Sequence, residues 1–131
     1  MTNKDLIFFN NLKKEIKYAQ NLLDKTYSLS SEIKDTLSLF YKTLKNKKKI
    51  FICGNGGSAS DAEHLSTEFL VRLRPNVNRR AFPVISLALD TSTITACGND
   101  FGFDTLFERL VNTLGNKNEE KLIVDKFFSY Y

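Results

Sequence analysis

The sequence is poor in the features that mark membrane, secreted and disulfide-bonded proteins. No apolar run approaches the roughly 18 residues that a membrane-spanning helix needs, and residues 1–14 lack the apolar core of a secretory signal. Cys53 and Cys97 do not form a CxxC pair, which argues against a zinc knuckle or a disulfide scaffold and favours two buried free thiols. These absences predict a cytoplasmic protein with no membrane segment.

The length and the charge of the chain further restrict the class of protein that it can be. A chain of 131 residues has room for one domain, and its 42% hydrophobic and 26% charged residues are typical of a soluble globular protein. The net charge of +4 would suggest nucleic acid only if basic residues shared one face with stacking aromatics. The run Lys45–Lys49 instead fits a solvated connection, and Arg72–Arg80 fits a loop that could meet an anionic substrate. No nucleic acid partner is expected.

Apolar residues recur every three to four positions in four segments, as expected of amphipathic helices. A first helix is predicted over Leu6–Leu23, and a second begins near Ser30 or Ser31 and ends in the lysine run. A third follows the glycine-rich turn, a short one covers Ser92–Ala96, and the last lies over Leu106–Leu114. The apolar stripes comprise Leu6, Phe9, Leu12, Ile16, Ala19, Leu22 and Leu23, then Ile33, Leu37, Phe40, Tyr41 and Leu44, then Ala62, Leu65, Phe69 and Leu73, and finally Leu106, Leu110, Val111 and Leu114.

Two continuous apolar runs, "IFIC" at Ile50–Cys53 and "VISLAL" at Val84–Leu89, are typical of strands buried on both faces of a parallel sheet. The run "KLIV" at Lys121–Val124 could begin a third strand. Strands that alternate with helices at these lengths predict an α/β sandwich with a parallel sheet. Ligands of such sheets bind at the carboxyl ends of the strands, so the turn after Cys53 lies at the mouth of any site.

The stretch "GNGGSAS" at residues 54–60 is that turn. Its glycines let the backbone bend sharply and approach a ligand, while the next helix offers unpaired N–H groups and a positive dipole end. Asn55, Gly56, Gly57 and Ser58 therefore predict a cradle for a phosphate or a sugar hydroxyl, although a well-capped helix start with nothing bound is the alternative. The stretch is neither a Walker loop nor GxGxxG, so no nucleotide is implied.

His64 and Glu68 are four residues apart on the predicted helix, and both side chains project from one face. The pair could supply two ligands of a metal, or a general base beside one, whereas a surface hydrogen-bonded pair is the alternative. The adjacent glycine turn favours the functional interpretation. Arg72 continues this face by one more turn and could hold a carboxylate or phosphate, or form a salt bridge with Glu68.

Polar turn residues lie at a second predicted rim. Asp90 follows the second strand, and Asn99 and Asp100 lie in the glycine-flanked "GNDFGFD" turn. Such residues are often turn formers alone. Two rims that both carry Asn, Asp and Gly nevertheless argue for a polyol site.

Taken together, "CGNGGSASDAEHLSTEFLVRL" and "LALDTSTITACGNDFGFDTLFERLV" resemble the sugar isomerase (SIS) fold and, within it, the phosphoheptose isomerases. The resemblance is close over residues 50–115 and consistent with the N-terminal helices. It implies a three-layer α/β sandwich and a single partial SIS domain over 1–131. Residues 1–48 would form its N-terminal helical region and 49–131 the start of its α/β core.

The resemblance also implies roles for individual residues. His64 and Glu68 would bind a zinc ion, and Glu68 would also contact the substrate and act as the catalytic base. Arg72 and Asp90 match positions near the family's site. The remaining substrate contacts would come from Asn55, Gly56, Gly57, Ser58, Asn99 and Asp100.

The implied reaction converts D-sedoheptulose 7-phosphate to D-glycero-D-manno-heptose 7-phosphate, for the heptose of bacterial lipopolysaccharide and other surface polysaccharides. A base moves a proton between C1 and C2 through an enediol, while a metal stabilises the developing oxyanion. The family resemblance also implies a homotetramer with sites near subunit boundaries. The stripe Leu6, Phe9, Leu12 and Ile16 is a plausible interhelical surface.

The sequence departs from the family pattern after Gly115. The pattern continues with a strand, a phosphate loop of the form STSG and a late helix that supplies a glutamine and a histidine to the metal. The segment "NKNEEKLIVDKFFSYY" contains neither the loop nor a histidine. A truncated or frameshifted chain is therefore expected, and an inactive one, because catalytic zinc usually has three protein ligands.

A function of another class stays open. Some relatives with the SIS fold are non-catalytic regulators that bind a protein, including one that binds the bacterial replication initiator. In those regulators the helix after the glycine turn lacks the catalytic glutamate. Glu68 therefore favours the isomerase.

Overall fold

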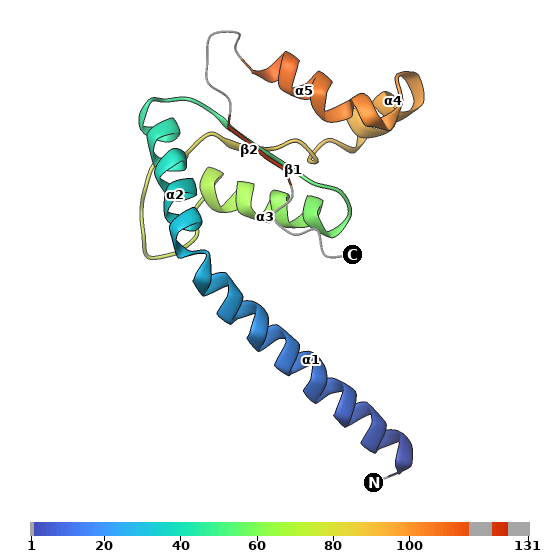
Figure 1. Cartoon of the computed structure of the whole chain (residues 1–131). Coiled ribbons are helices and arrows are strands. Elements are labelled where there is room, and N and C mark those ends of the chain that lie inside the picture. The colour runs from blue at the N-terminus through green and yellow to red at the C-terminus, as the bar shows by residue number, and fades with distance from the viewer. Residues whose placement is uncertain (1, 116–121, 126–131) are drawn as a thin grey trace. The chain divides into compact units, whose positions relative to one another are not determined.

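The computed structural model describes residues 2–115 and 122–125, and the chain divides into two compact units, Met1–Leu39 and Phe40–Tyr131. None of the helices within the described residues combines the length and the hydropathy that crossing a membrane requires. In chain order the elements are α1 (Asn3–Ser28), α2 (Ser30–Lys45), β1 (Ile50–Cys53), α3 (Gly57–Leu70), β2 (Val84–Ser86), α4 (Thr91–Asp100), a 3-10 turn (Phe103–Thr105), α5 (Leu106–Leu114) and β3 (Leu122–Asp125) (Figure 1).

Helix α1 is longer than the periodicity of its apolar residues predicts, because a capping box fixes its start. The Thr2 amide donates to Asp5 Oδ2 at 2.7 Å, and the Asp5 amide donates to Thr2 Oγ1 at 3.3 Å. None of the side chains of α1 is buried in the described structure, so its apolar stripe is exposed. Helix α2 begins at Ser30, whose hydroxyl donates to the Tyr27 carbonyl rather than capping the new helix.

The sheet has three parallel strands in the order β2-β1-β3, with β1 in the centre. Ile50 lies opposite Val84 on one side and Leu122 on the other. The Leu87 amide extends the pairing by donating to the Ile52 carbonyl at 2.8 Å. The predicted parallel sheet is therefore confirmed, and so is a third strand within the segment that "KLIV" begins.

Helices cover both faces of this sheet (Figure 1). Successive strand residues point to opposite faces, so β1 contributes to two separate cores. Its first and third residues pack with the end of α2 and with α3, in a cluster of Phe40, Leu44, Ile50, Ile52, Ala62 and Val84. Its second and fourth residues pack with α5, in a cluster of Phe51, Cys53 and Leu87 joined by Phe107, Leu110 and Val111. The predicted three-layer α/β sandwich is thus confirmed within the second unit, and both cysteines are buried as thiols.

The second strand and the helix after it differ from the sequence prediction. Strand β2 ends at Ser86 instead of Leu89, because the chain turns there to reach the start of α4 at Thr91. Helix α4 then runs to Asp100, well beyond the predicted Ala96. The apolar run is therefore longer than the strand, because its last three residues form a turn.

Ser66 closes the outer edge of β2. This side chain of α3 is only 1% exposed. Its hydroxyl donates to the Val84 carbonyl at 2.8 Å and accepts from the Ser86 amide at 3.2 Å. The carbonyl of Val84 and the amide of Ser86 point away from β1, because backbone groups along a strand alternate between its two sides. The Ser66 hydroxyl therefore makes the hydrogen bonds that a further strand would have made with β2.

We expect Ser66→Ala to destabilise the fold, because it leaves a buried carbonyl and a buried amide without partners. Such an orphaned group costs roughly 1–3 kcal/mol. Thr67→Ala is the matched control, since Thr67 is exposed and donates only to the Glu63 carbonyl on its own helix. Urea unfolding followed by circular dichroism measures both, and equal losses for the two variants would contradict this role of Ser66.

Candidate functional site

The turn after β1 is shorter than predicted and is tightly constrained. Helix α3 begins at Gly57, so Ser58 lies in its first turn rather than in a loop. Gly56 has a φ of 57°, a conformation that glycine adopts without steric cost. A Cβ on Gly54 would lie 2.7 Å from the backbone carbonyl of Ser58, so only glycine lets α3 begin this close to the strand.

This turn presents backbone donors at the carboxyl end of the central strand. Two hydrogen bonds form the first turn of the helix: the Ser58 amide donates to the Asn55 carbonyl at 3.2 Å, and the Ala59 amide donates to the Gly56 carbonyl at 3.1 Å. The amides of Gly56 and Gly57 precede this ladder and are donors that the helix itself does not use. Their position at a helix N-terminus suits an anion, as the cradle interpretation requires.

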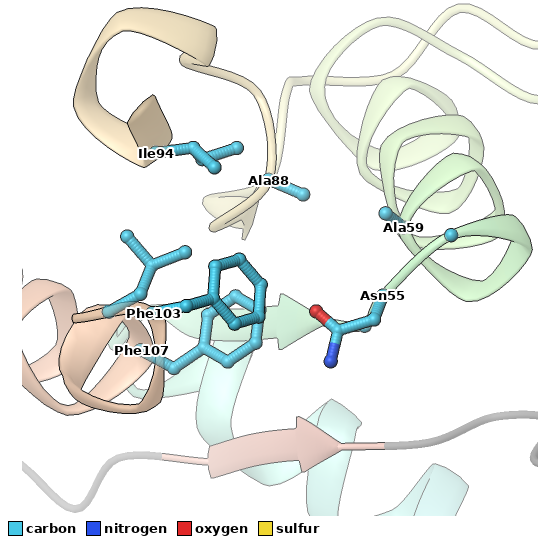
Figure 2. A pocket seen from close by; sticks show the side chains of 9 residues that line it. Asn55, Ala59, Ala88, Ile94, Phe103 and Phe107 are labelled. Atoms are coloured by element: carbon cyan, nitrogen blue, oxygen red, sulfur yellow. The ribbon is translucent and has the colours of Figure 1, made fainter. Parts of the chain in front are cut away.

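A cavity of about 190 Å³ adjoins the turn. Figure 2 shows the Asn55 carboxamide beside the rings of Phe103 and Phe107. The cavity is lined by Gly54, Asn55, Gly56, Ala59, Ala88, Ile94, Phe103, Leu106 and Phe107. Its wall is therefore mostly apolar, and Asn55 and Gly56 are the predicted site residues that reach it.

The apolar lining was missed by sequence reasoning. Ala88 belongs to the turn that was expected to be strand, and Phe103 follows the glycine of a segment selected only for its polar residues. Nothing in the sequence separates an aromatic ring that lines a cavity from one that fills a core, because both are apolar residues near a buried strand.

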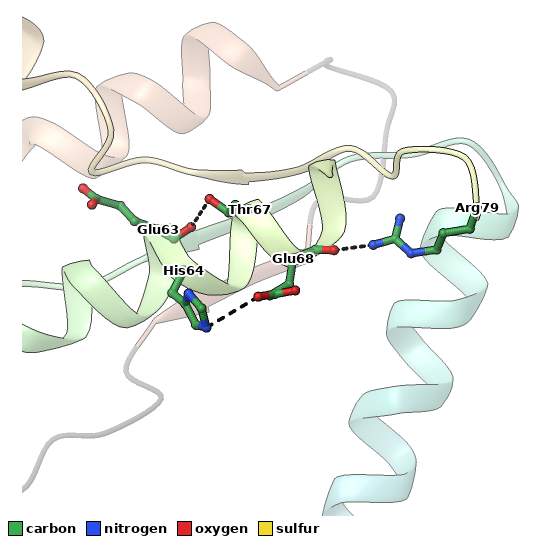
Figure 3. A network of polar contacts seen from close by, with 5 residues as sticks. All are labelled: Glu63, His64, Thr67, Glu68 and Arg79. Carbon is green, nitrogen blue, oxygen red and sulfur yellow. Dashed lines mark hydrogen bonds and ion pairs between the residues drawn. The ribbon is translucent and has the colours of Figure 1, made fainter. Parts of the chain in front are cut away.

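His64 and Glu68 face one another on α3, as predicted (Figure 3). His64 Nε2 lies 3.6 Å from Glu68 Oε1, and this contact is an ion pair when the imidazole is protonated. The two side chains differ in environment, since that of His64 is 78% exposed and that of Glu68 only 21%. An exposed imidazole beside a largely buried carboxylate can bind and release a proton or hold a cation.

The second carboxylate oxygen of Glu68 is buried without a hydrogen-bond partner in the described structure. Burying an ionisable oxygen without a partner is costly, and native structures seldom do so without a functional reason. This oxygen is therefore available to a proton, a substrate hydroxyl or a metal ion. It is the most unusual polar atom on the predicted face of α3.

Arg72 does not continue the His64 and Glu68 face, and that prediction is wrong. Helix α3 ends at Leu70, and Val71 leaves the helical conformation with φ −108° and ψ −87°. The Arg72 guanidinium instead donates to the Pro75 carbonyl at 3.0 Å, within its own loop. The predicted extension of this helix to Leu73 is wrong for the same reason.

Asp90 is the N-cap of α4. Its Oδ1 accepts from the Ser92 amide at 3.0 Å, and its Oδ2 accepts from the Thr93 hydroxyl. The hydrogen bonds from Thr93, followed by the bond from Ser92, hold the pKa of the Asp90 carboxyl below its ordinary value. The capping explains its position after the second strand, and its proposed substrate contact stays a prediction.

Asn99 and Asp100 lie in the last turn of α4, so the prediction of a glycine-flanked turn at these residues is wrong. The helix continues through Gly98 and ends at Asp100 with Phe101 as its C-cap, and the turn falls at Gly102, where φ is 87°. Both side chains are exposed, and the Asn99 amide donates to Asp100 Oδ1 at 2.7 Å. Neither residue lines the cavity beside Asn55.

The described residues supply only part of a metal site. Within residues 2–115 and 122–125, no group of three His, Cys, Asp or Glu side chains is arranged to hold a metal ion. His64 and Glu68 fit two positions of such a site, because a neutral imidazole nitrogen and an unpaired carboxylate oxygen are common ligands of zinc. His64 and Glu68 could therefore supply two ligands of a metal site that needs further ligands.

The sequence model of the SIS domain matches residues 16–124, and the chain therefore belongs to the SIS domain family. Within this family, the chain is similar to curated phosphoheptose isomerases. The chain is 42% identical over 109 residues to the phosphoheptose isomerase of Helicobacter pylori strain P12, covering 82% of this chain and 56% of the relative. It is 46% identical over 82 residues to the phosphoheptose isomerase of Chlorobaculum parvum, covering 63% of this chain and 39% of the relative.

Solved structures give the same result. The fold matches phosphoheptose isomerase GmhA from Neisseria gonorrhoeae with a TM-score of 0.72 and 30% identity, over 95% of this chain and 60% of the other. It matches a phosphoheptose isomerase from Francisella tularensis with a TM-score of 0.69 and 30% identity, over 95% and 61%. The resemblance identified from the motifs is thus confirmed, and the matches span between 39% and 61% of the length of these relatives.

We expect Gly54→Ala to destabilise the chain, because the new methyl group would collide with the start of α3. Overpacking of this kind typically costs about 1–3 kcal/mol. Gly98→Ala is the matched control: a Cβ there meets nothing within 4 Å, and alanine favours a helix interior by up to about 1 kcal/mol. Thermal unfolding measures both variants, and an unchanged midpoint for Gly54→Ala would show that α3 can shift to make room.

Proposed function

We propose that the chain carries part of the active site of a phosphoheptose isomerase that converts D-sedoheptulose 7-phosphate to D-glycero-D-manno-heptose 7-phosphate in the cytoplasm. The observation that carries the proposal is that Oε2 of Glu68, on the helix that begins at the glycine turn, is buried and has no hydrogen-bond partner among the described residues. The reported relatives are all named phosphoheptose isomerases, which favours the enzyme over a non-catalytic regulator.

The substrate would be held at the carboxyl end of the sheet. The amides of Gly56 and Gly57 and the hydroxyl of Ser58 would bind the phosphate, because a helix N-terminus stabilises an anion. Asn55 would offer its carboxamide to a sugar oxygen. We assign further substrate contacts, by the family resemblance alone, to Arg72, Asp90, Asn99 and Asp100.

Glu68 would move the proton in the reaction. As a carboxylate, it would take a proton from C1 of the ketose to give an enediolate and would return that proton to C2. The hydroxyl proton of the C1 oxygen would pass to the C2 oxygen, which leaves the aldehyde at C1 of the aldose. A base that serves both carbons carries the proton between the two transfers, so its oxygen must not be held by another group of the protein. The free Oε2 supports this role, and its burial would limit exchange of the proton with water.

We further propose that His64 and Glu68 bind zinc together with ligands from outside the described residues. Zinc would stabilise the negative charge that develops on the sugar oxygens. The i, i+4 spacing and the facing side chains support this assignment. We also propose that both units belong to one SIS domain, since the family match crosses the boundary at Leu39.

Glu68→Gln should abolish most turnover, because an amide cannot accept the C1 proton. Loss of general-base catalysis lowers rates by roughly 10²- to 10⁴-fold. Formation of heptose 7-phosphate should be measured both for this chain and for a chimera that adds the carboxyl-terminal part of the Helicobacter pylori relative. His64→Ala should first weaken zinc binding, with partial rescue by added zinc.

Glu63→Gln is the matched control, since it changes another glutamate of the same helix to which no role is assigned. It should leave both turnover and zinc affinity nearly unchanged. Near-native turnover of Glu68→Gln in an active chimera would show that the catalytic base has been misassigned.

We also propose that the protein forms a homotetramer and that the exposed stripe of α1 contributes to its contacts. Leu6, Phe9, Leu12 and Ile16 are each 43–51% exposed, although apolar side chains on a helix are normally covered. A second copy of the same helix would cover them.

Self-association should therefore depend on the apolar face of α1. Leu12→Gln combined with Ile16→Gln should shift sedimentation towards monomer, because it removes two apolar contacts at i, i+4 spacing. Lys13→Gln combined with Lys17→Gln has the same spacing on a polar part of the helix and should change little. A folded monomer at all accessible concentrations of the parent chain would refute the proposal.

A further inference from the structure

The last turn of α3 is held by an arginine that lies ten residues further along the chain. Arg79 Nη1 donates to the Phe69 carbonyl at 2.9 Å, and Nη2 donates to the Glu68 carbonyl (Figure 3). The same Nη1 donates to the Arg80 carbonyl at 2.8 Å, and the Arg79 guanidinium carbon lies 5.1 Å from the centre of the Phe82 ring. One side chain therefore ties the loop before β2 to the end of the helix that carries Glu68.

These contacts account for the end of the helix. In a longer helix the carbonyls of Glu68 and Phe69 would accept from the amides of residues 72 and 73. Here the Glu68 carbonyl accepts from Arg79, and the Phe69 carbonyl accepts from both Arg79 and the Phe82 amide, the latter at 3.1 Å. The rigid fork of a guanidinium fits two adjacent carbonyls, and its charge suits a helix C-terminus.

The Arg79 guanidinium binds the backbone of Glu68 and, in the described structure, makes no ion pair with its carboxylate. Arg72, the other arginine expected near this face, donates to the Pro75 carbonyl. In the described part of the chain, the recorded ionic contact of the Glu68 carboxylate is the one with His64, and Oε2 has no hydrogen bond. The backbone of Glu68 is thus fixed while its reactive oxygen stays free.

We propose that Arg79 is the positioning residue for Glu68: it fixes the main chain of the carboxylate without neutralising the carboxylate. The inference rests on the proposed function only in what Glu68 does, namely proton transfer and metal binding. It adds a residue from outside the two motifs. An ion pair between an arginine and the Glu68 carboxylate would instead stabilise the charge and compete with a metal or a proton.

The positioning itself is tested on the metal-free chain with Arg79→Lys and Arg79→Ala. Arg80→Ala is the matched control, because its guanidinium carbon lies 5.2 Å from the centre of the same Phe82 ring. Amide hydrogen exchange should accelerate about tenfold or more at Phe69, Leu70 and Val71 in Arg79→Ala, the scale of losing charge-assisted hydrogen bonds. The carbon-13 signal of the Glu68 carboxyl should shift, and Arg79→Lys should restore these properties only in part.

Zinc titration by competition with a chelator tests the consequence. Arg79→Ala should weaken zinc binding about tenfold, as loss of outer-sphere partners commonly does, and Arg80→Ala less than about twofold. In a Glu68→Gln background, Arg79→Ala should have no further effect, because its influence passes through Glu68. A merely structural contribution would instead persist in both backgrounds.

The outcomes separate the two proposals. If the parent chain binds no zinc, or if Glu68→Gln does not weaken binding, the metal assignment fails while exchange and the carboxyl signal still decide the role of Arg79. If those two readouts change no more in Arg79→Ala than in Arg80→Ala, the positioning role is overturned. If Arg79→Ala does not fold, the same comparison is made with Arg79→Lys.

Discussion

The hydroxyl of Ser66 lies between α3 and β2, where it donates to the Val84 carbonyl and accepts from the Ser86 amide. A short strand at the edge of a sheet has backbone groups that water or another strand must satisfy. Here a helix satisfies them, and this fixes the rotation and depth of α3. Since the same helix carries the glycine turn at one end and Glu68 near the other, the geometry of the candidate site depends on how α3 is seated.

A second constraint acts at the start of α3. The approach of Ser58 to Gly54 leaves no room for a Cβ, so the helix begins directly at the end of the central strand. Its first amides therefore lie beside the apolar cavity that Phe103 and Phe107 line. Apolar walls beside backbone donors lower the local dielectric and strengthen electrostatic contacts, which supports the proposed phosphate cradle.

In the part of the chain that the structure describes, Glu68 combines a largely buried side chain, a carboxylate oxygen without a hydrogen bond and a backbone carbonyl bound by Arg79. Arg72 donates to the Pro75 carbonyl and Arg79 to carbonyls at the end of α3, and neither guanidinium makes an ion pair with this carboxylate in the described structure. An ion pair with an arginine would make the carboxylate a weaker base and a weaker ligand, because its charge would already be stabilised. The loop after α3 thus stabilises the helix in a way that is compatible with chemistry at Glu68.

The sequence by itself determined the elements that rest on local pattern: the central strand, the parallel sheet, the last helix and the i, i+4 pairing of His64 with Glu68. The strand, the helix and the i, i+4 pair depend on neighbours along the chain, so hydrophobic period reports them, and the alternation of strands with helices indicates the parallel sheet. The tertiary structure decided the end of α3, the length of β2 and the helical placement of Asn99 and Asp100. Arg79 binds the end of α3 from ten residues away, and residues 87–89 of the apolar run form the turn before Asp90, the N-cap of α4. The Arg79 contact joins residues that are distant in sequence, and the turn goes against the strand propensity of an apolar run, so hydrophobic period reveals neither of them.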